Sequence, residues 1–330
     1  MKLRVKKCAA LLLALCMGLG MSGCMARVIA EDSVKLDLPD IDPEDGAARE
    51  LAVTLYYRLA NEEYLIGVNG RVSVRSGERA EAAVIRALTG AGSVPAGVAA
   101  VIPADVSVQE LAYEDGLLSV TLSGEFLNED MVTSIKEEDY LREKDYNNAV
   151  RSATQEMYTA RRLGVLSIVN TIAGSGEDVK VQIYVQQGGS SAVRLTWKQL
   201  GLADGGSSFL EPMGFVEEVV AAEKDIAACM LGRMRNEDYE KAYALVTESR
   251  DAAKPSYDEF EAEMRGLGKV VSYEITDSGT DDNGLYVLAN VRISSPGGTV
   301  KRISNAALYM AKEGEIYKVG YGSLLKLMES

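Results

Sequence analysis

The chain has 330 residues, with 49 acidic residues, 35 basic residues and no histidine, so its formal net charge at pH 7 is −14. A surface of this sign repels phosphate backbones, and no nucleic-acid partner is therefore expected. Without histidine the chain lacks the commonest general base and the commonest transition-metal ligand, which excludes Ser-His, Cys-His and His-metal mechanisms.

The first 23 residues have the layout of a secretory signal. Four basic residues come before the apolar run AALLLALCM at residues 9–17, which is shorter than the roughly 20 apolar residues that span a membrane. The next residues, GLGMSG, also fit a dinucleotide-binding glycine fingerprint, but no strand precedes them. We expect residues 1–23 to be a signal peptide, and its removal changes the formal charge from −14 to −18.

Ser22 and Gly23 directly precede Cys24. This arrangement resembles the lipobox of bacterial lipoproteins, although Met21 stands where that family more often has leucine. The resemblance implies that Cys24 is lipidated, becomes the new N-terminus and holds the protein on the extracytoplasmic face of the cell membrane. Ordinary cleavage and an uncleaved anchor are the alternatives. Of the four cysteines, only Cys229 would then keep a free thiol, so no intrachain disulfide is expected.

Residues 24–48 form an acidic segment. Alternating acids at Asp40, Asp42 and Glu44 are similar to those of a calcium-binding EF-hand loop. Asp45, however, replaces the glycine that such a loop needs at its sixth position, and the bidentate acid at its end is missing. We therefore expect a solvated tether and no metal site.

A first folded domain is expected at residues 49–200. Apolar patterning predicts strands at LAVTLYY (51–57) and at YLIGVNGRVSV (64–74). The spacing of alanine, valine and leucine in ERAEAAVIRAL (78–88) predicts an amphipathic helix. The domain therefore begins with a strand pair and a helix.

The second half of this domain repeats that order. VSVQELAYEDGLLSVTLS (106–123) predicts two strands joined by an Asp-Gly turn, and a charged insertion follows until about Asn148. Apolar residues at helical spacing predict a helix at residues 157–173, and VKVQIYV (179–185) predicts a closing strand.

This order of elements resembles the GerMN domain, a module of sporulation and germination proteins in Gram-positive bacteria. The resemblance rests on VTLYY, on LLSVTLS and most specifically on SIVNTIAGSGEDVKVQIYVQQGG (167–189). In that family the helix ends in an Asn-Thr-Leu-like tripeptide, which Asn170, Thr171 and Ile172 match. Thr121 replaces an acid that the family commonly has, and the charged insertion is longer than usual. The resemblance implies a mixed α/β sandwich that docks another protein.

Two GGSS sequences, at residues 188–191 and 205–208, indicate a domain boundary. The stretch AVRLTWKQL between them is expected to be a last strand of the first domain or part of the linker. We place the linker at residues 201–212 and a second domain at residues 213–330.

The second domain is predicted to contain three helices followed by four strands. A first helix is predicted from the helical spacing of Val216, Val219, Val220, Ile226 and Met230, and two more helices are predicted at residues 236–246 and 256–267. The period then changes to two, and Asn-Gly, Pro-Gly-Gly and Glu-Gly turns separate the strands.

This arrangement is similar to the NTF2-like cone, in which a curved antiparallel sheet wraps a helix. The expected fold class is therefore α+β, with a GerMN-type mixed α/β sandwich followed by an NTF2-like cone of three helices on a curved antiparallel sheet. The residues expected to point into the cone are apolar: Val287, Ala289, Val291 and Ile293. This favours a filled core or an apolar ligand over acid–base catalysis.

No residue is predicted to be catalytic, and no cofactor or metal is expected. Cys229 lies beside the apolar stripe of its helix, where a free cysteine usually packs as a small hydrophobe. The consecutive acids at residues 137–139 point apart and do not share a proton. Asn170 and Thr171 lie near a helix end, where we expect them to cap the backbone.

The residues and resemblances together predict a lipid-anchored, non-enzymatic extracytoplasmic protein. Its GerMN domain would dock another envelope or sporulation protein, during envelope assembly in sporulation or during germination, with exposed strand edges as contact sites. The membrane would be bound through acyl chains on Cys24. The alternative is a binding lipoprotein whose NTF2-like pocket holds a small apolar molecule or a cell-wall fragment. A peptidoglycan hydrolase is disfavoured, because histidine and a convergent acid pair are missing.

Overall fold

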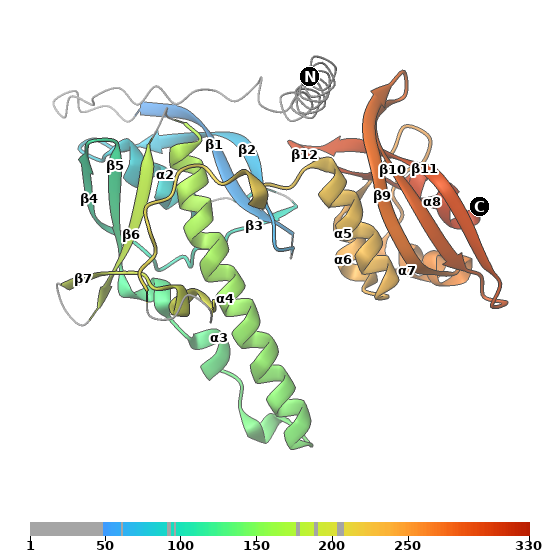
Figure 1. Ribbon diagram of the computed structural model, residues 1–330, viewed down its shortest axis with the longest axis horizontal. Helices are drawn as coiled ribbons and strands as arrows, with labels where there is room; N and C mark the ends of the chain where they lie inside the picture. Colours follow the sequence, from blue (N-terminus) through green and yellow to red (C-terminus); the bar gives the residue numbers. More distant parts are fainter. Residues whose placement is uncertain are drawn as a thin grey trace, which may run out of the picture.

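The computed structural model describes residues 49–60, 62–90, 94–95, 97–175, 179–187, 191–202 and 208–330. The predicted signal peptide, Cys24 and the acidic tether lie outside the described residues. The described residues form a mixed α+β structure with two units, and Figure 1 shows helix α4 extending away from the first of them. Among the residues described, no helix is long and apolar enough to cross a membrane.

The first sheet of the first unit has the order β2-β1-β3 and is antiparallel. Its strands are β1 (Arg49–Leu59), β2 (Leu65–Val74) and β3 (Val98–Ala99). Helix α2 (Ala80–Leu88) packs against β1, in which alternate residues are buried: Leu51, Val53, Leu55, Tyr57 and Leu59. The predicted strand pair and helix are therefore confirmed.

The second sheet has the order β4-β5-β6-β7, and only β5 and β6 are parallel within it. Its strands are β4 (Val108–Glu114), β5 (Leu117–Leu122), β6 (Lys180–Gln187) and β7 (Ser191–Arg194), and the short 3-10 helix η5 (Trp197–Leu200) follows. Asp115 and Gly116 join β4 to β5 with φ values of 49° and 78°. Positive φ at both turn residues is what a two-residue hairpin turn requires, so the predicted hairpin is confirmed.

Helix α4 (Glu143–Ala173) has 31 residues and begins well before the predicted start at residue 157. Its first half has only a narrow stripe of half-buried Tyr146, Val150 and Ala153 among charged and polar side chains, and the prediction did not include it. The charged insertion that precedes it contains η3 (Gly124–Leu127), the short helix α3 (Asp130–Thr133) and η4 (Glu137–Asp139).

The C-terminal half of α4 packs against both sheets, through contacts with β1 and β6. On the side of β1 that faces away from β2, the Ser167 hydroxyl donates to the Tyr56 carbonyl at 2.5 Å. The Tyr56 N–H donates to Oγ1 of Thr171 at 3.0 Å. Ser167 and Thr171 lie one helical turn apart on α4. Their hydroxyls thus form hydrogen bonds with the N–H and C=O groups of Tyr56, with which a further strand could otherwise have paired.

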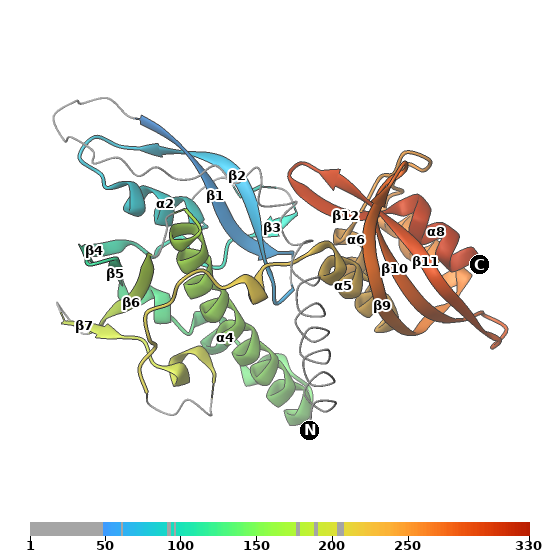
Figure 2. The same ribbon diagram turned by 45° about the horizontal axis from the view of Figure 1, so that its top comes forward.

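The second unit has a five-stranded sheet in the order β8-β12-β11-β10-β9, in which β9 to β12 form the predicted antiparallel meander. Figure 2 shows the curved sheet with helix α8 beside it. Its helices are α5 (Glu223–Arg235), α6 (Tyr239–Ala244), α7 (Tyr257–Leu267) and α8 (Tyr321–Glu329). Its strands are β8 (Val246–Thr247), β9 (Lys269–Asp281), β10 (Gly284–Ser294), β11 (Val300–Glu313) and β12 (Ile316–Gly320).

The start of the second unit differs from the prediction. Val216, Val219 and Val220 precede the first helix, in an extended segment with the short 3-10 helix η7 (Glu217–Val219). Val220 forms a parallel bridge with Leu65, and the N–H of the next residue donates to the Leu65 carbonyl at 2.7 Å. The three valines are apolar because this segment lies against the first unit. Helix α8 and the two-residue strand β8 were also not predicted.

The interior of the second unit is filled by apolar side chains. Val287, Ala289, Val291 and Ile293 are at most 4% exposed and belong to the same buried cluster as Phe260. The prediction that these strand residues face the core is confirmed.

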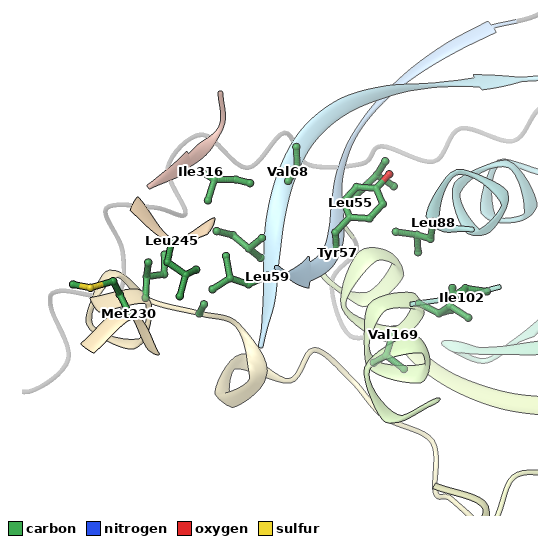
Figure 3. Close-up of a cluster of buried hydrophobic side chains, with 14 of the residues drawn as sticks. Leu55, Tyr57, Leu59, Val68, Leu88, Ile102, Val169, Met230, Leu245 and Ile316 are labelled. Carbon is green, nitrogen blue, oxygen red and sulfur yellow. The ribbon is translucent and has the colours of Figure 1, made fainter. Parts of the chain in front are cut away.

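The hydrophobic cores of the two units are continuous. Figure 3 shows the buried cluster extending from Leu88 and Val169 in the first unit, past Leu59, to Leu245 and Ile316 in the second. Residue 209 of the predicted linker and residue 213, the first of the predicted second domain, also contact the first unit, because they form antiparallel bridges with residues 196 and 181. The two units therefore share an apolar contact as well as the chain connection.

We predict that replacing Ser167 by alanine and Thr171 by valine together lowers the free energy of unfolding by about 1–3 kcal/mol, because the backbone groups of Tyr56 lose their partners. Urea unfolding followed by circular dichroism measures this change. Ser152→Ala, which removes an exposed hydroxyl from the same helix, should change the value by less than about 0.5 kcal/mol. Equal losses in the two variants would contradict the assignment.

Candidate functional site

Asn170 and Thr171, the strongest points of the family resemblance, do not cap a helix end. Both are at most 1% exposed, and α4 continues beyond them to Ala173. The Asn170 side-chain amide donates to the Val216 carbonyl at 2.9 Å, and the Val216 N–H donates to the Asn170 side-chain oxygen at 2.8 Å. Asn170 therefore fixes the segment that enters the second unit, and the expectation of a local cap was wrong.

A pocket of about 290 Å³ lies where α5 faces the first unit. It is lined by Glu62, Tyr64, Asp225, Ala228, Cys229, Gly232, Arg233, Asn236 and Tyr273. Arg233 donates two hydrogen bonds to the Glu62 carboxylate, at 2.7 and 2.9 Å. The ion pair joins the two units beside the pocket.

The thiol of Cys229 is held in its protonated form. Burial and the nearby Glu62 carboxylate raise the pKa of Cys229 to about 12. Because the thiolate is the reactive species, Cys229 is a poor nucleophile at neutral pH. This supports the expectation that the cysteine packs as a small hydrophobe.

Other sequence candidates for chemistry are dispersed in the structure. Glu137, Glu138 and Asp139 form η4 and are exposed to solvent. Within the described ranges, no group of three or more Cys, Asp or Glu side chains is arranged to hold a metal ion. The feature that stands out from the body of the protein is instead the first half of α4 together with α3 and η4, which we call the arm (residues 128–156).

Two buried arginines, Arg58 and Arg161, hold the base of the arm. Arg58 of β1 is 5% exposed and forms an ion pair with Glu156 through two hydrogen bonds, one of them 3.1 Å long. Its Nε also donates to the backbone carbonyl of Glu62 at 2.7 Å. The first sheet therefore binds α4 at the point where the helix leaves the body.

Arg161 and Gly164 attach the chain segment that leads into the arm. The Arg161 guanidinium donates to the backbone carbonyls of Leu127 at 2.6 Å and Asn128 at 3.1 Å. Phe126 is 3% exposed, and a Cβ at position 164 would lie 3.2 Å from its ring, so glycine permits this close packing. Both chain segments of the arm, the one that enters it and helix α4 that leaves it, are therefore held at its base.

The arm itself has no buried residue between Glu143 and Glu156. At 1.5 Å per residue these two and the twelve residues between them extend about 20 Å, and α3 packs along them. Figures 1 and 2 both show this part of α4 projecting from the first unit. Short isolated helices are marginal in water, so the arm depends on its base for its orientation.

Apolar side chains lie exposed at the arm. Leu141 is fully exposed at 104%, Met131 is 47% exposed, and Tyr140 is 36% exposed. The Tyr140 ring lies 6.0 Å from the ring of Tyr146. In the sequence these residues lie within a charged insertion. The adjacent pair Tyr140-Leu141 within EEDYLREKD is the signal that could have indicated an apolar contact site there.

No protein-family model matches the sequence, and the search of curated proteins finds no match. Among solved structures, the chain is similar to the tandem GerMN domains of the sporulation protein GerM from Bacillus subtilis, with 14% identity and a TM-score of 0.29. The match covers 78% of this chain and 62% of that chain, so this chain spans less than two thirds of its length. A TM-score of this size does not identify a shared fold, and the GerMN resemblance continues to rest on the sequence motifs.

We predict that Cys229 resists alkylation. A chain that starts at Met25 has Cys229 as its sole cysteine. At pH 8, a thiol with a pKa near 12 has on the order of a thousandfold less thiolate than the same thiol in the unfolded chain. Iodoacetamide should therefore alkylate the folded chain more slowly, by a similar factor, than the chain unfolded in urea.

The Glu62 carboxylate accounts for part of this protection. Glu62→Gln removes the adjacent negative charge, so the pKa of the thiol should fall and alkylation should become faster at pH 8. Glu63→Gln, at a neighbouring exposed position, should leave the rate unchanged. Mass spectrometry of timed samples measures both rates, and equal rates for the two variants would contradict the role of Glu62.

Proposed function

We propose that the protein is a lipid-anchored, non-enzymatic docking protein on the extracytoplasmic face of the membrane. Its partner is another envelope or sporulation protein, and its role lies in envelope assembly during sporulation or in germination. The sporulation context comes from the GerMN-like sequence at residues 167–189, and the anchor comes from the lipobox-like residues before Cys24. The NTF2-like assignment of the second unit belongs to the same proposal and is supported by the three helices α5 to α7 and the antiparallel meander that follows them.

The observation that carries the docking role is the exposed tip of the arm. Leu141 lies in the bend between η4 and α4, is fully exposed, and contributes nothing to the core of this chain. Aromatic and aliphatic side chains of this kind become binding anchors when a partner's pocket excludes water from them. The hydrogen bonds at the base of the arm keep the tip in one orientation, which lowers the ordering cost of binding.

The alternative function, binding of an apolar ligand inside the second unit, is less well supported. The strand residues that face the interior are packed in the buried cluster. The pocket beside α5 has charged and hydroxyl-bearing walls, which do not suit an apolar molecule. The arm is therefore the better candidate.

Lipidation is tested by growing cells with a labelled fatty acid. We expect the wild-type chain to carry the label and to sediment with membranes. Cys24→Ala should carry no label and should be found in the soluble extracytoplasmic fraction or retain its signal. A labelled Cys24→Ala chain, or an unlabelled wild-type chain, would overturn the anchor.

Docking is tested by placing a photoreactive amino acid at position 141 in the anchored protein and irradiating intact cells. We expect a defined adduct at this position and none at position 300, an exposed valine of β11. Position 113 on the exposed strand β4 tests the sheet edge instead. Adducts at 113 without adducts at 141 would transfer docking to the sheet edge, and no adduct at any position would overturn the docking role.

A further inference from the structure

The arm has an excess of acidic side chains. Between Asn128 and Glu156 the chain has eight acidic and four basic residues. Two of the basic residues near the tip are already neutralised within the arm: Arg142 pairs with Asp145 at 2.7 Å, and Lys136 lies 3.9 Å from Glu138.

Three other carboxylates at the tip have no such partner. Glu137, Asp139 and Glu143 are exposed and form no ion pair with any described residue. They stand within four residues of Leu141 on its two sides in the sequence. Lys144 near the tip also forms no ion pair with a described residue, so residues 136–145 have five acids against three bases and a net charge of −2. The apolar tip is therefore bordered by an excess of negative charge.

An apolar centre with a charged border has the composition of a protein-binding surface. Two other occupants are opposed by the same charges. The cytoplasmic-membrane lipids attract basic segments and repel acidic ones when their headgroups are anionic. A second copy of this chain has the same overall negative charge, which opposes self-association.

We propose that the partner of the arm is a protein with an apolar pocket that receives Leu141 and Tyr140 and is bordered by lysine or arginine side chains. This inference rests on the docking role proposed above and adds the chemistry of the partner. Opposite charges around the contact accelerate encounter and exclude partners of the wrong sign. The apolar residues supply the affinity of the complex once water is expelled.

The test uses the photoreactive position 141 in the anchored, full-length protein, in cells washed into low or high salt. Adduct formation should fall on the order of tenfold between 20 mM and 500 mM NaCl, because salt screens the attraction. The triple variant Glu137→Gln, Asp139→Asn and Glu143→Gln should show a similar loss at 20 mM NaCl and little further loss at 500 mM.

A matched variant controls for the change in net charge. Asp258→Asn, Asp282→Asn and Glu315→Gln neutralise three exposed acids of the second unit that form no ion pair with any described residue. This variant should retain the wild-type adduct yield at both salt concentrations. Unchanged thermal melting of both triple variants shows that the fold is intact.

The outcomes separate the two proposals. An adduct at position 141 that is insensitive to salt and to the arm carboxylates would overturn the basic partner and leave docking in place. Absence of any adduct at positions 141 and 113 would overturn docking itself. Purified chain starting at Met25 should also fail to bind vesicles of phosphatidylglycerol and phosphatidylcholine; binding that Leu141→Asp abolishes would make lipid the partner and overturn the inference.

Discussion

The arrangement of the molecule depends on helix α4 being bound from several sides along its C-terminal half. Ser167 and Thr171 bind the backbone of Tyr56 in the first sheet, and Asn170 binds the backbone of Val216 at the entrance to the second unit. These are buried polar side chains, and each finds its partners in the backbone of another element, which is the condition under which polar groups are tolerated in a core. One helix thus fixes a sheet and the start of the second unit.

The same helix accounts for the projecting arm. A helix buried over its second half can continue into solvent if its last contacts hold it firmly, and the Arg58–Glu156 ion pair and the Arg161 hydrogen bonds lie at that point. The Glu156 side chain is 45% exposed but Arg58 is buried, so loss of the Glu156 carboxylate would leave a buried positive charge less well compensated. The arm is therefore a solvent-exposed continuation of a helix whose second half is buried, and the contacts at its base orient the tip that carries Leu141.

Sequence reasoning succeeded where one face of an element is buried. The alternation in β1 and the Asp-Gly turn after β4 translate directly into observed structure, because burial imposes a period and a tight turn imposes positive φ. It failed for Val216, Val219 and Val220, whose apolar character reflects contact with the other unit. It also failed for the first half of α4, where the narrow stripe of Tyr146, Val150 and Ala153 lies among charged and polar side chains. It failed for Leu141, since exposure of a single leucine cannot be read from a charged stretch.

Hydrogen exchange in the anchored protein tests the central claim, that the arm is the contact surface, most directly. Exchange would be compared between native membranes and the chain purified in detergent. The account predicts that backbone amides of residues 128–156 gain protection in native membranes, while those of β4 and β9 do not change. Unchanged exchange in the arm, or new protection confined to a strand edge, would contradict the account.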